Sequence, residues 1–66
     1  MRLRLNGELR DVPDGTTIGA LIASLGLAAE RVAVEVDGDV FGGAEAADRE
    51  LRPDERVELI QFVGGG

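Results

Sequence analysis

The residues best suited to chemistry are the last three of the sequence, Gly64, Gly65 and Gly66. They follow an apolar run over residues 56–63 that has the composition of a strand. Glycine has no Cβ, so it packs poorly in a core and keeps the greatest backbone freedom. We expect residues 64–66 to form a flexible tail that reaches about 10 Å when fully extended. A carboxylate at its tip can be threaded into a partner's active site and modified there.

The alternative interpretation of these glycines is a frayed terminus, since the ends of chains are commonly disordered. Sixty-six residues leave room for one domain and a small core. We therefore expect a compact domain over residues 1–63 and a separate tail over residues 64–66.

Side chains that could act as nucleophiles or metal ligands are scarce. The sequence has no cysteine and no histidine, and all seven basic residues are arginine. Disulfides, thiolate or imidazole metal sites and a histidine general base are thereby excluded. An activated carboxy-terminal carbonyl would meet no strong nucleophile from its own chain, although an arginine-favouring coding bias explains the missing lysine equally well. We predict no catalytic residue, no bound metal and no cofactor.

The charge balance is acidic, with thirteen carboxylates against seven arginines and a net charge of −6. This argues against nucleic-acid binding, which requires a basic surface, and fits docking on a basic partner. No apolar run is long enough to span a membrane, and the first residues lack a signal-peptide pattern, so a cytoplasmic location is expected. Many carboxylates fall in predicted turns, where a solvated surface role is expected: Asp37, Asp39, Glu45, Asp48, Glu50, Asp54 and Glu55.

The sequence opens with a predicted hairpin. Leu3 and Leu5 alternate with arginines, Asn6-Gly7 marks a turn, and residues 9–12 form the returning strand. A two-residue turn would place Leu9 on the polar face. A loop one residue longer would pair Leu9 with Leu3, and the apolar pattern favours that register.

A short helix follows the break at residues 13–15. Thr16 and Thr17 are both suitable N-caps, and Gly26 suits the left-handed position after the last turn, with Leu27 packing back on the helix. The apolar positions between them have helical spacing: Ile18, Leu21, Ile22 and Leu25.

The remaining elements complete a mixed sheet. Alternating valines predict a strand over residues 32–36, which a turn at 37–38 and a weak edge strand at 40–41 follow. Residues 42–48 are expected to form a loop, and residues 52–55 a turn before the last strand. The first and last strands can lie side by side only in parallel, because the helix lies in the connection between them. The order predicts an α+β, ubiquitin-like β-grasp fold, with a four- to five-stranded mixed sheet and one main helix on one face.

The last strand presents apolar residues on both faces. If Glu58 stays in water, Val57 and Leu59 face the helix, and Ile60 and Phe62 lie on the open face beside the glycines. Together the two side chains form either a small satellite cluster or a docking patch that presents the tail to a partner. We predict partner docking through Ile60 and Phe62.

Three segments together resemble the ThiS family, the ubiquitin-like sulfur carriers of thiamine biosynthesis. They are the opening hairpin over residues 3–7, the helix entry over residues 14–18 and the ending over residues 62–66. The resemblance covers the whole chain and implies a protein that is modified by enzymes and is not an enzyme itself. It implies that the Gly66 carboxylate is adenylated and converted to a thiocarboxylate, with Gly64 and Gly65 threading through a narrow channel.

The resemblance also implies the partners. They are a ThiF-type, E1-like adenylyltransferase that supplies ATP and magnesium, a ThiG-type thiazole synthase that receives the sulfur, and a sulfur donor such as a cysteine desulfurase. MoaD-type carriers of molybdopterin synthesis, and carriers for other thiolation pathways, share the fold and the glycine ending. A non-covalent interaction module that binds through Ile60 and Phe62 is the alternative from another class.

Overall fold

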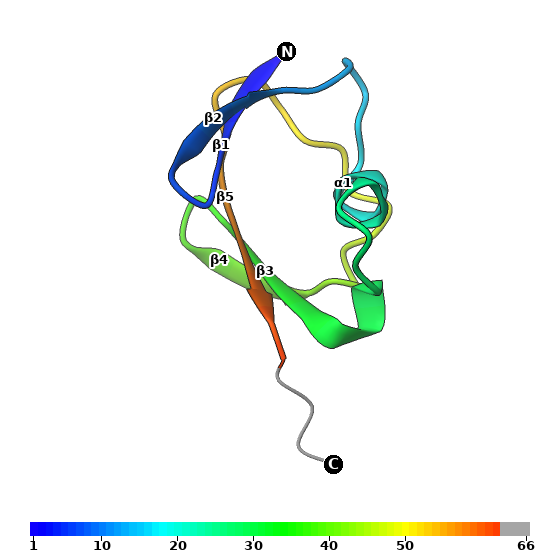
Figure 1. The fold of residues 1–66 in the computed structure, drawn as a ribbon. Helices are drawn as coiled ribbons and strands as arrows, with labels where there is room; N and C mark the ends of the chain where they lie inside the picture. Colours follow the sequence, from blue (N-terminus) through cyan, green and yellow to red (C-terminus); the bar gives the residue numbers. More distant parts are fainter. Residues whose placement is uncertain (63–66) are drawn as a thin grey trace.

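Five strands and one α-helix make up residues 1–62, the part of the chain that the computed structural model describes. The elements are β1 (Arg2–Leu5), β2 (Glu8–Asp11), α1 (Ile18–Ser24), the 3₁₀ helix η1 (Ala29–Arg31), β3 (Val32–Val36), β4 (Asp39–Gly42) and β5 (Arg56–Gln61). The strand order is β2-β1-β5-β3-β4, with β1 and β5 parallel and the other pairs antiparallel. The predicted β-grasp fold, including the parallel contact between the first and last strands, is confirmed (Figure 1).

The register predicted for the first hairpin is wrong. Leu9 lies opposite Arg4, because Asn6 and Gly7 form a two-residue turn in which both have positive φ, 50° and 83°. These angles define the type I′ turn whose twist matches that of paired strands, and Asn-Gly is the favoured sequence for it. Turn geometry therefore overrides the burial of one leucine, and the Leu9 side chain is 59% exposed on the open face.

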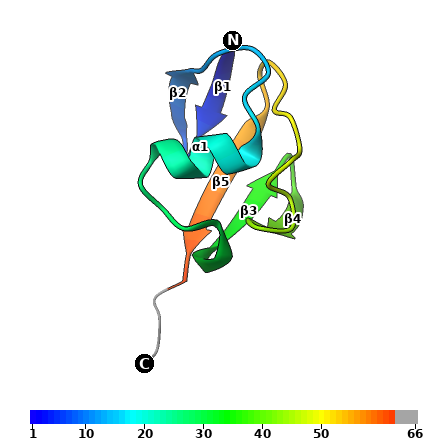
Figure 2. The ribbon, with the colours of Figure 1, turned by 90° about the vertical axis from the view of Figure 1, so that its right-hand side faces the viewer.

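Helix α1 begins and ends as its sequence predicts. The Thr17 hydroxyl accepts a hydrogen bond from the Ala20 backbone N–H at 3.1 Å and is the N-cap. At the other end Gly26 has φ 74°, and the Leu27 N–H donates to the Ile22 carbonyl at 3.2 Å in a Schellman ending. The helix lies across one face of the sheet (Figure 2). Among residues 1–62, the helices are too short or too polar to cross a bilayer.

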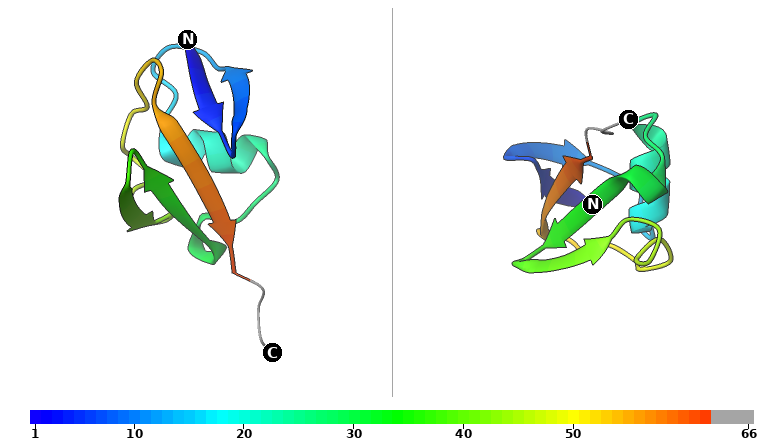
Figure 3. Two further views of the ribbon diagram at one scale, coloured as in Figure 1. Left: turned by 90° about the vertical axis from the view of Figure 1, so that its left-hand side faces the viewer. Right: turned by 90° about the horizontal axis from the view of Figure 1, so that it is seen from below.

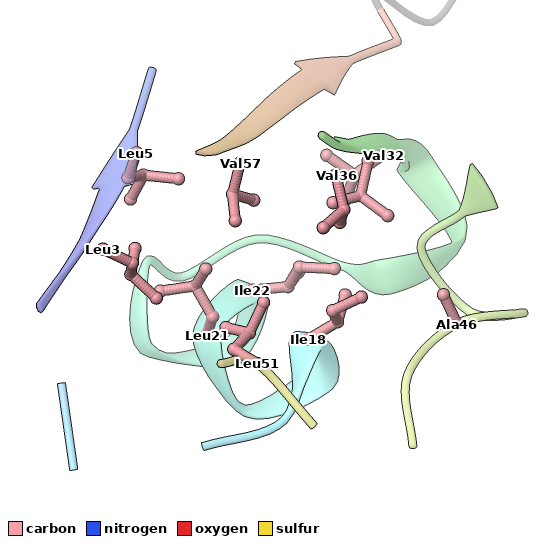
Figure 4. Packing of buried hydrophobic residues seen from close by; sticks show 11 residues of the cluster. Leu3, Leu5, Ile18, Leu21, Ile22, Val32, Val36, Ala46, Leu51 and Val57 are labelled. Carbon is pink, nitrogen blue, oxygen red and sulfur yellow. The ribbon is translucent and has the colours of Figure 1, made fainter. Parts of the chain in front are cut away.

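The core lies between α1 and the inner face of the sheet (Figure 4). Leucines of β1, valines of β3 and β5, and the apolar side of α1 converge there. Because a helix of two turns is marginal alone, this burial stabilises α1. The buried members are Leu3, Leu5, Ile18, Leu21, Ile22, Val32, Val34, Val36, Ala46, Leu51 and Val57.

The segment between β4 and β5 has turns and no regular helix, as the sequence predicts. It follows α1 closely, since the Ile18 N–H donates to the Arg49 carbonyl and the Gly19 N–H to the Ala47 carbonyl, both at 2.9 Å. Gly43 is buried, and a Cβ there would lie 2.5 Å from the Ala29 carbonyl oxygen. The segment is therefore fixed against both the helix and the start of β3.

One carboxylate of this segment corrects a prediction. The sequence predicts Glu55 on the solvated surface with six other acidic residues, but Glu55 is only 7% exposed. Its Oε1 accepts the Arg52 backbone N–H at 2.7 Å, and its Oε2 lies 3.3 Å from the Arg49 guanidinium. Hydrogen bonds and a counter-charge offset the desolvation of a buried carboxylate, so Glu55 closes the turn before β5 as a structural residue. The other six are exposed, as predicted.

Candidate functional site

The carboxyl end of β5 is the point from which the predicted tail starts. Gly64, Gly65 and Gly66, with Val63, lie outside the described residues, so their predicted roles stay predictions. Up to Phe62 the chain is held in place, because the Phe62 N–H donates to the Arg31 carbonyl at 2.8 Å and extends the pairing of β5 with β3. The end of β5 lies far from the amino terminus (Figure 1).

The two faces of β5 separate as the sequence predicts. Val57 is fully buried and Leu59 packs against the core, whereas Ile60 and Phe62 are 49% and 55% exposed on the face away from α1. Figure 3 shows this open face, with β5 between β1 and β3. The exposure of the two apolar side chains is confirmed, and their role in docking a partner stays a prediction.

Two further apolar side chains lie on the open face. Leu9 lies opposite Arg4 of β1, and Val40 of β4, 62% exposed, lies opposite Glu35 of β3. Sequence reasoning missed Leu9 as a surface residue because it set the type I′ signal of Asn6-Gly7 aside. The strand that contains Val40 was predicted, but the face of the sheet on which the Val40 side chain lies was not. Exposed apolar groups thus extend from one edge of the sheet to the other.

Charged side chains on this face occur as like-charged neighbours. Arg4 and Arg56 are register partners on β1 and β5, and Glu35 and Glu58 are partners on β3 and β5. Within residues 1–62 the salt bridges involve other residues than these four. Like charges directly opposite each other destabilise a sheet. The face therefore shows, in order along β5, a basic row, an acidic row and an apolar end formed by Ile60 and Phe62.

The described residues contain no arrangement suited to catalysis. Residues 1–62 hold no group of three or more acidic side chains placed to bind a metal ion. A surface hollow lined by Glu35, Asp37, Asp54 and Arg56 has carboxylates and a guanidinium but no activated nucleophile, and the sequence has no cysteine or histidine to supply one. What the geometry offers is an apolar and charged surface beside the end of β5.

Comparison with known proteins identifies the family. The family model described as the ThiS family matches residues 3–66. The chain is 36% identical to the sulfur carrier protein ThiS of Thermus thermophilus over 62 residues, which cover 94% of this chain and 95% of that protein. It is also 38% identical over 66 residues to a thiazole synthase of Magnetococcus marinus, and spans 20% of that protein's length. A thiazole synthase of Paramagnetospirillum magneticum gives 32% identity, again over 20% of its length.

Solved structures agree in fold. The crystal structure of the thiamine biosynthesis protein ThiS from Geobacter metallireducens superposes with a TM-score of 0.78 at 30% identity, over the full length of both chains. The solution structure of a thiamine biosynthesis protein from the same organism gives 0.75 at 30% identity, covering all of this chain and 88% of the other. Sequence family, relatives and fold therefore agree, and this chain is a member of the ThiS family.

Proposed function

We propose that this protein is a sulfur carrier of thiamine biosynthesis whose reacting group is the Gly66 carboxylate. The observation that carries the proposal is the ThiS family match, which runs to residue 66 and so includes the three glycines. It is supported by the 36% identity to the Thermus thermophilus sulfur carrier across nearly the whole of both chains. The proposal assigns no enzymatic role to this chain, because the sequence has no cysteine, histidine or lysine and the acidic side chains of residues 1–62 form no group that could hold a metal ion.

The proposed chemistry takes place at one carboxyl group, that of Gly66. A carboxylate oxygen of Gly66 attacks the α-phosphorus of ATP on a ThiF-type adenylyltransferase, which releases pyrophosphate and leaves an acyl-adenylate. The terminal sulfur of a persulfide on a donor such as a cysteine desulfurase then attacks the carbonyl carbon, and AMP leaves, which gives an acyl disulfide. A thiol then attacks the donor's sulfur in this disulfide, forms a new disulfide with the donor and releases the sulfur bound to Gly66. The product is a thiocarboxylate. ATP and magnesium belong to the partner enzyme, since this sequence has no Gly-rich phosphate loop ending in Lys-Ser or Lys-Thr.

A thiazole synthase is the proposed sulfur acceptor. Two relatives of the chain are thiazole synthases, in each of which the chain matches about a fifth of the length. A carrier and its acceptor must come together for each transfer, so sequence similarity to a segment of the acceptor enzyme favours a ThiG-type partner over a molybdopterin-forming one. We infer that docking on either partner uses the open face beside Ile60 and Phe62.

The tail variants test the proposed chemistry. Deletion of Gly66, or replacement of Gly65 by tryptophan, should abolish thiocarboxylate formation, because the terminal carboxylate is set back by one residue from the reaction centre or a side chain blocks a narrow channel. Thermal unfolding should change by less than about 0.5 kcal/mol, the range of surface substitutions. Sulfur transfer that survives deletion of Gly66 would refute the assignment of this carboxylate.

A matched pair of variants tests the docking role. Phe62→Ala removes an apolar side chain beside the tail, and Val40→Ala removes one of similar exposure at the far edge of the same face. We expect Phe62→Ala to weaken binding to the adenylyltransferase by about 10-fold or more, the effect of a typical interface anchor, and Val40→Ala to have a much smaller effect. Equal affinities for the two variants, with intact folds, would remove the Ile60 and Phe62 patch from the proposal.

A further inference from the structure

The strand β2 is an open edge of the sheet. It is the outermost strand next to β1, and all four of its residues, Glu8–Asp11, are exposed. At the opposite edge the Gly42 carbonyl of β4 accepts the Ala46 N–H at 3.0 Å, so that edge is partly covered by its own chain. An open edge presents unpaired backbone groups on which another strand can pair.

The hydrogen bonds of the first hairpin determine which backbone groups of β2 point outward. Met1 and Val12 exchange two bonds, from the Val12 N–H to the Met1 carbonyl at 2.8 Å and from the Met1 amino group to the Val12 carbonyl at 2.7 Å. Bonded and non-bonded pairs alternate along an antiparallel ladder. Arg10 and Glu8 therefore bond inward to β1, while the backbone groups of Leu9 and Asp11 point away from the sheet.

Strand β2 of a second copy could pair antiparallel with this edge only if the outward backbone groups of the two strands face each other. Two registers that pair the strands around their middle residues meet this condition. In one register Arg10 lies opposite Arg10 of the other copy, and two like charges meet. In the other register Leu9 lies opposite Leu9, and Glu8 of each copy lies opposite Arg10 of the other. The second register gives one apolar pair and two opposite-charge pairs, each of them favourable across strands.

We propose that β2 is a self-association surface on which a second copy of this chain pairs in the Leu9-centred register. Charged side chains on an edge strand discourage pairing with unrelated strands. Here the charges of β2 are complementary to those of β2 in a second copy that is related to the first by a two-fold axis. Leu9, 59% exposed, becomes covered by its symmetry mate. Since β1 separates β2 from β5, Ile60 and Phe62 stay accessible in the pair. This inference does not depend on the proposed sulfur chemistry.

The pairing strand has only four residues, so the interface belongs to the small, transient class. We expect a weak association, with a dissociation constant on the order of 1 mM. Sedimentation equilibrium of the whole chain, and backbone amide shifts recorded from about 0.02 to 2 mM, would detect it. We expect concentration-dependent shifts at residues 8–11 and not at β4. A chain that stays monomeric with constant shifts over this range overturns the proposal.

Charge variants test the register. Arg10→Glu places the new glutamate of each copy opposite Glu8 of the other, so the association should weaken about tenfold or more. The control Arg31→Glu, in η1, makes the same change in net charge and should leave the association unaltered. The double variant Glu8→Arg/Arg10→Glu restores both opposite-charge pairs and the net charge of −6, so the association should return. All the substituted side chains are exposed, so unfolding should change little in each variant. Association unaffected by Arg10→Glu, or not restored by the double variant, contradicts this register.

Discussion

Gly43 is the position where one added methyl group should cost the fold most. An ideal Cβ there lies 2.5 Å from the Ala29 carbonyl oxygen, 2.9 Å from the Val32 carbonyl oxygen and 3.1 Å from the Ile22 Cδ1 atom. Non-bonded carbon–oxygen contacts ordinarily lie at about 3.3–3.6 Å. The contact of the added Cβ with the Ala29 carbonyl oxygen is therefore too close by nearly 1 Å. Both oxygens belong to the backbone, at the start of η1 and of β3, and neither can rotate away.

The predicted loss of stability follows from these contacts. Overpacking of a tight site costs about 1–3 kcal/mol. The Gly43 N–H also donates to the Val32 carbonyl at 2.8 Å, and displacement would weaken this bond, adding about 1 kcal/mol. We expect Gly43→Ala to lose about 2–4 kcal/mol, out of a total of roughly 3–10 kcal/mol for a chain of this size. The melting temperature should fall by about 10–30 °C.

Gly42 provides the matched control. A Cβ at Gly42 would meet only the Glu45 Cβ, at 3.7 Å, which is an ordinary contact. Gly42→Ala should therefore be neutral or should stabilise by up to about 1 kcal/mol, because alanine restricts the unfolded chain. Urea and thermal unfolding followed by circular dichroism compare the two variants with the wild type. If Gly43→Ala unfolds within about 0.5 kcal/mol of Gly42→Ala, the close packing described for this segment is wrong.

Two further predictions concern the helix and the open face. Thr17→Ala removes the N-cap hydrogen bond to the Ala20 N–H and should cost about 0.5–2 kcal/mol in chemical unfolding, and an unchanged midpoint would show that the cap contributes nothing. Glu58→Arg turns the like-charged contact with Glu35 into an opposite-charge pair and should stabilise the chain by about 0.3–1 kcal/mol. Glu45→Arg makes the same change in net charge at an exposed turn, so equal stability of the two variants would count against the like-charge repulsion.

The fold could be predicted from the sequence where local signals and burial agree. Thr17, Gly26 and the apolar residues between them specify helix α1 and both of its ends, and the alternating valines of β3 specify a strand with one buried face. The failure at Leu9 came from a conflict between two signals. The Asn6-Gly7 turn favours one register and burial of Leu9 favours the other, and the turn prevails because Leu9 lies on an edge strand.

The candidate site was predictable in part. The alternation along β5 was sufficient to place Ile60 and Phe62 on the open face. The strand can bury Val57 and keep Glu58 in water in only one orientation, and that orientation exposes Ile60 and Phe62. The like-charged rows were not predictable, because they depend on which residues of β1 and β3 lie opposite Arg56 and Glu58. The buried Glu55 was missed for a similar reason. Its partner Arg49 is six positions away, and only the folding of the loop against α1 brings the two side chains together.

The central claim is that Gly66 bears the transferable sulfur, and the mass of the protein tests it most directly. The chain is incubated with its ThiF-type adenylyltransferase, ATP, magnesium and a sulfur donor, and the Thermus thermophilus sulfur carrier serves as the positive control. We predict a mass increase equal to the replacement of one oxygen by one sulfur, located by fragmentation to the peptide ending in Gly66. An unchanged mass, under conditions that modify the control carrier, would contradict the account.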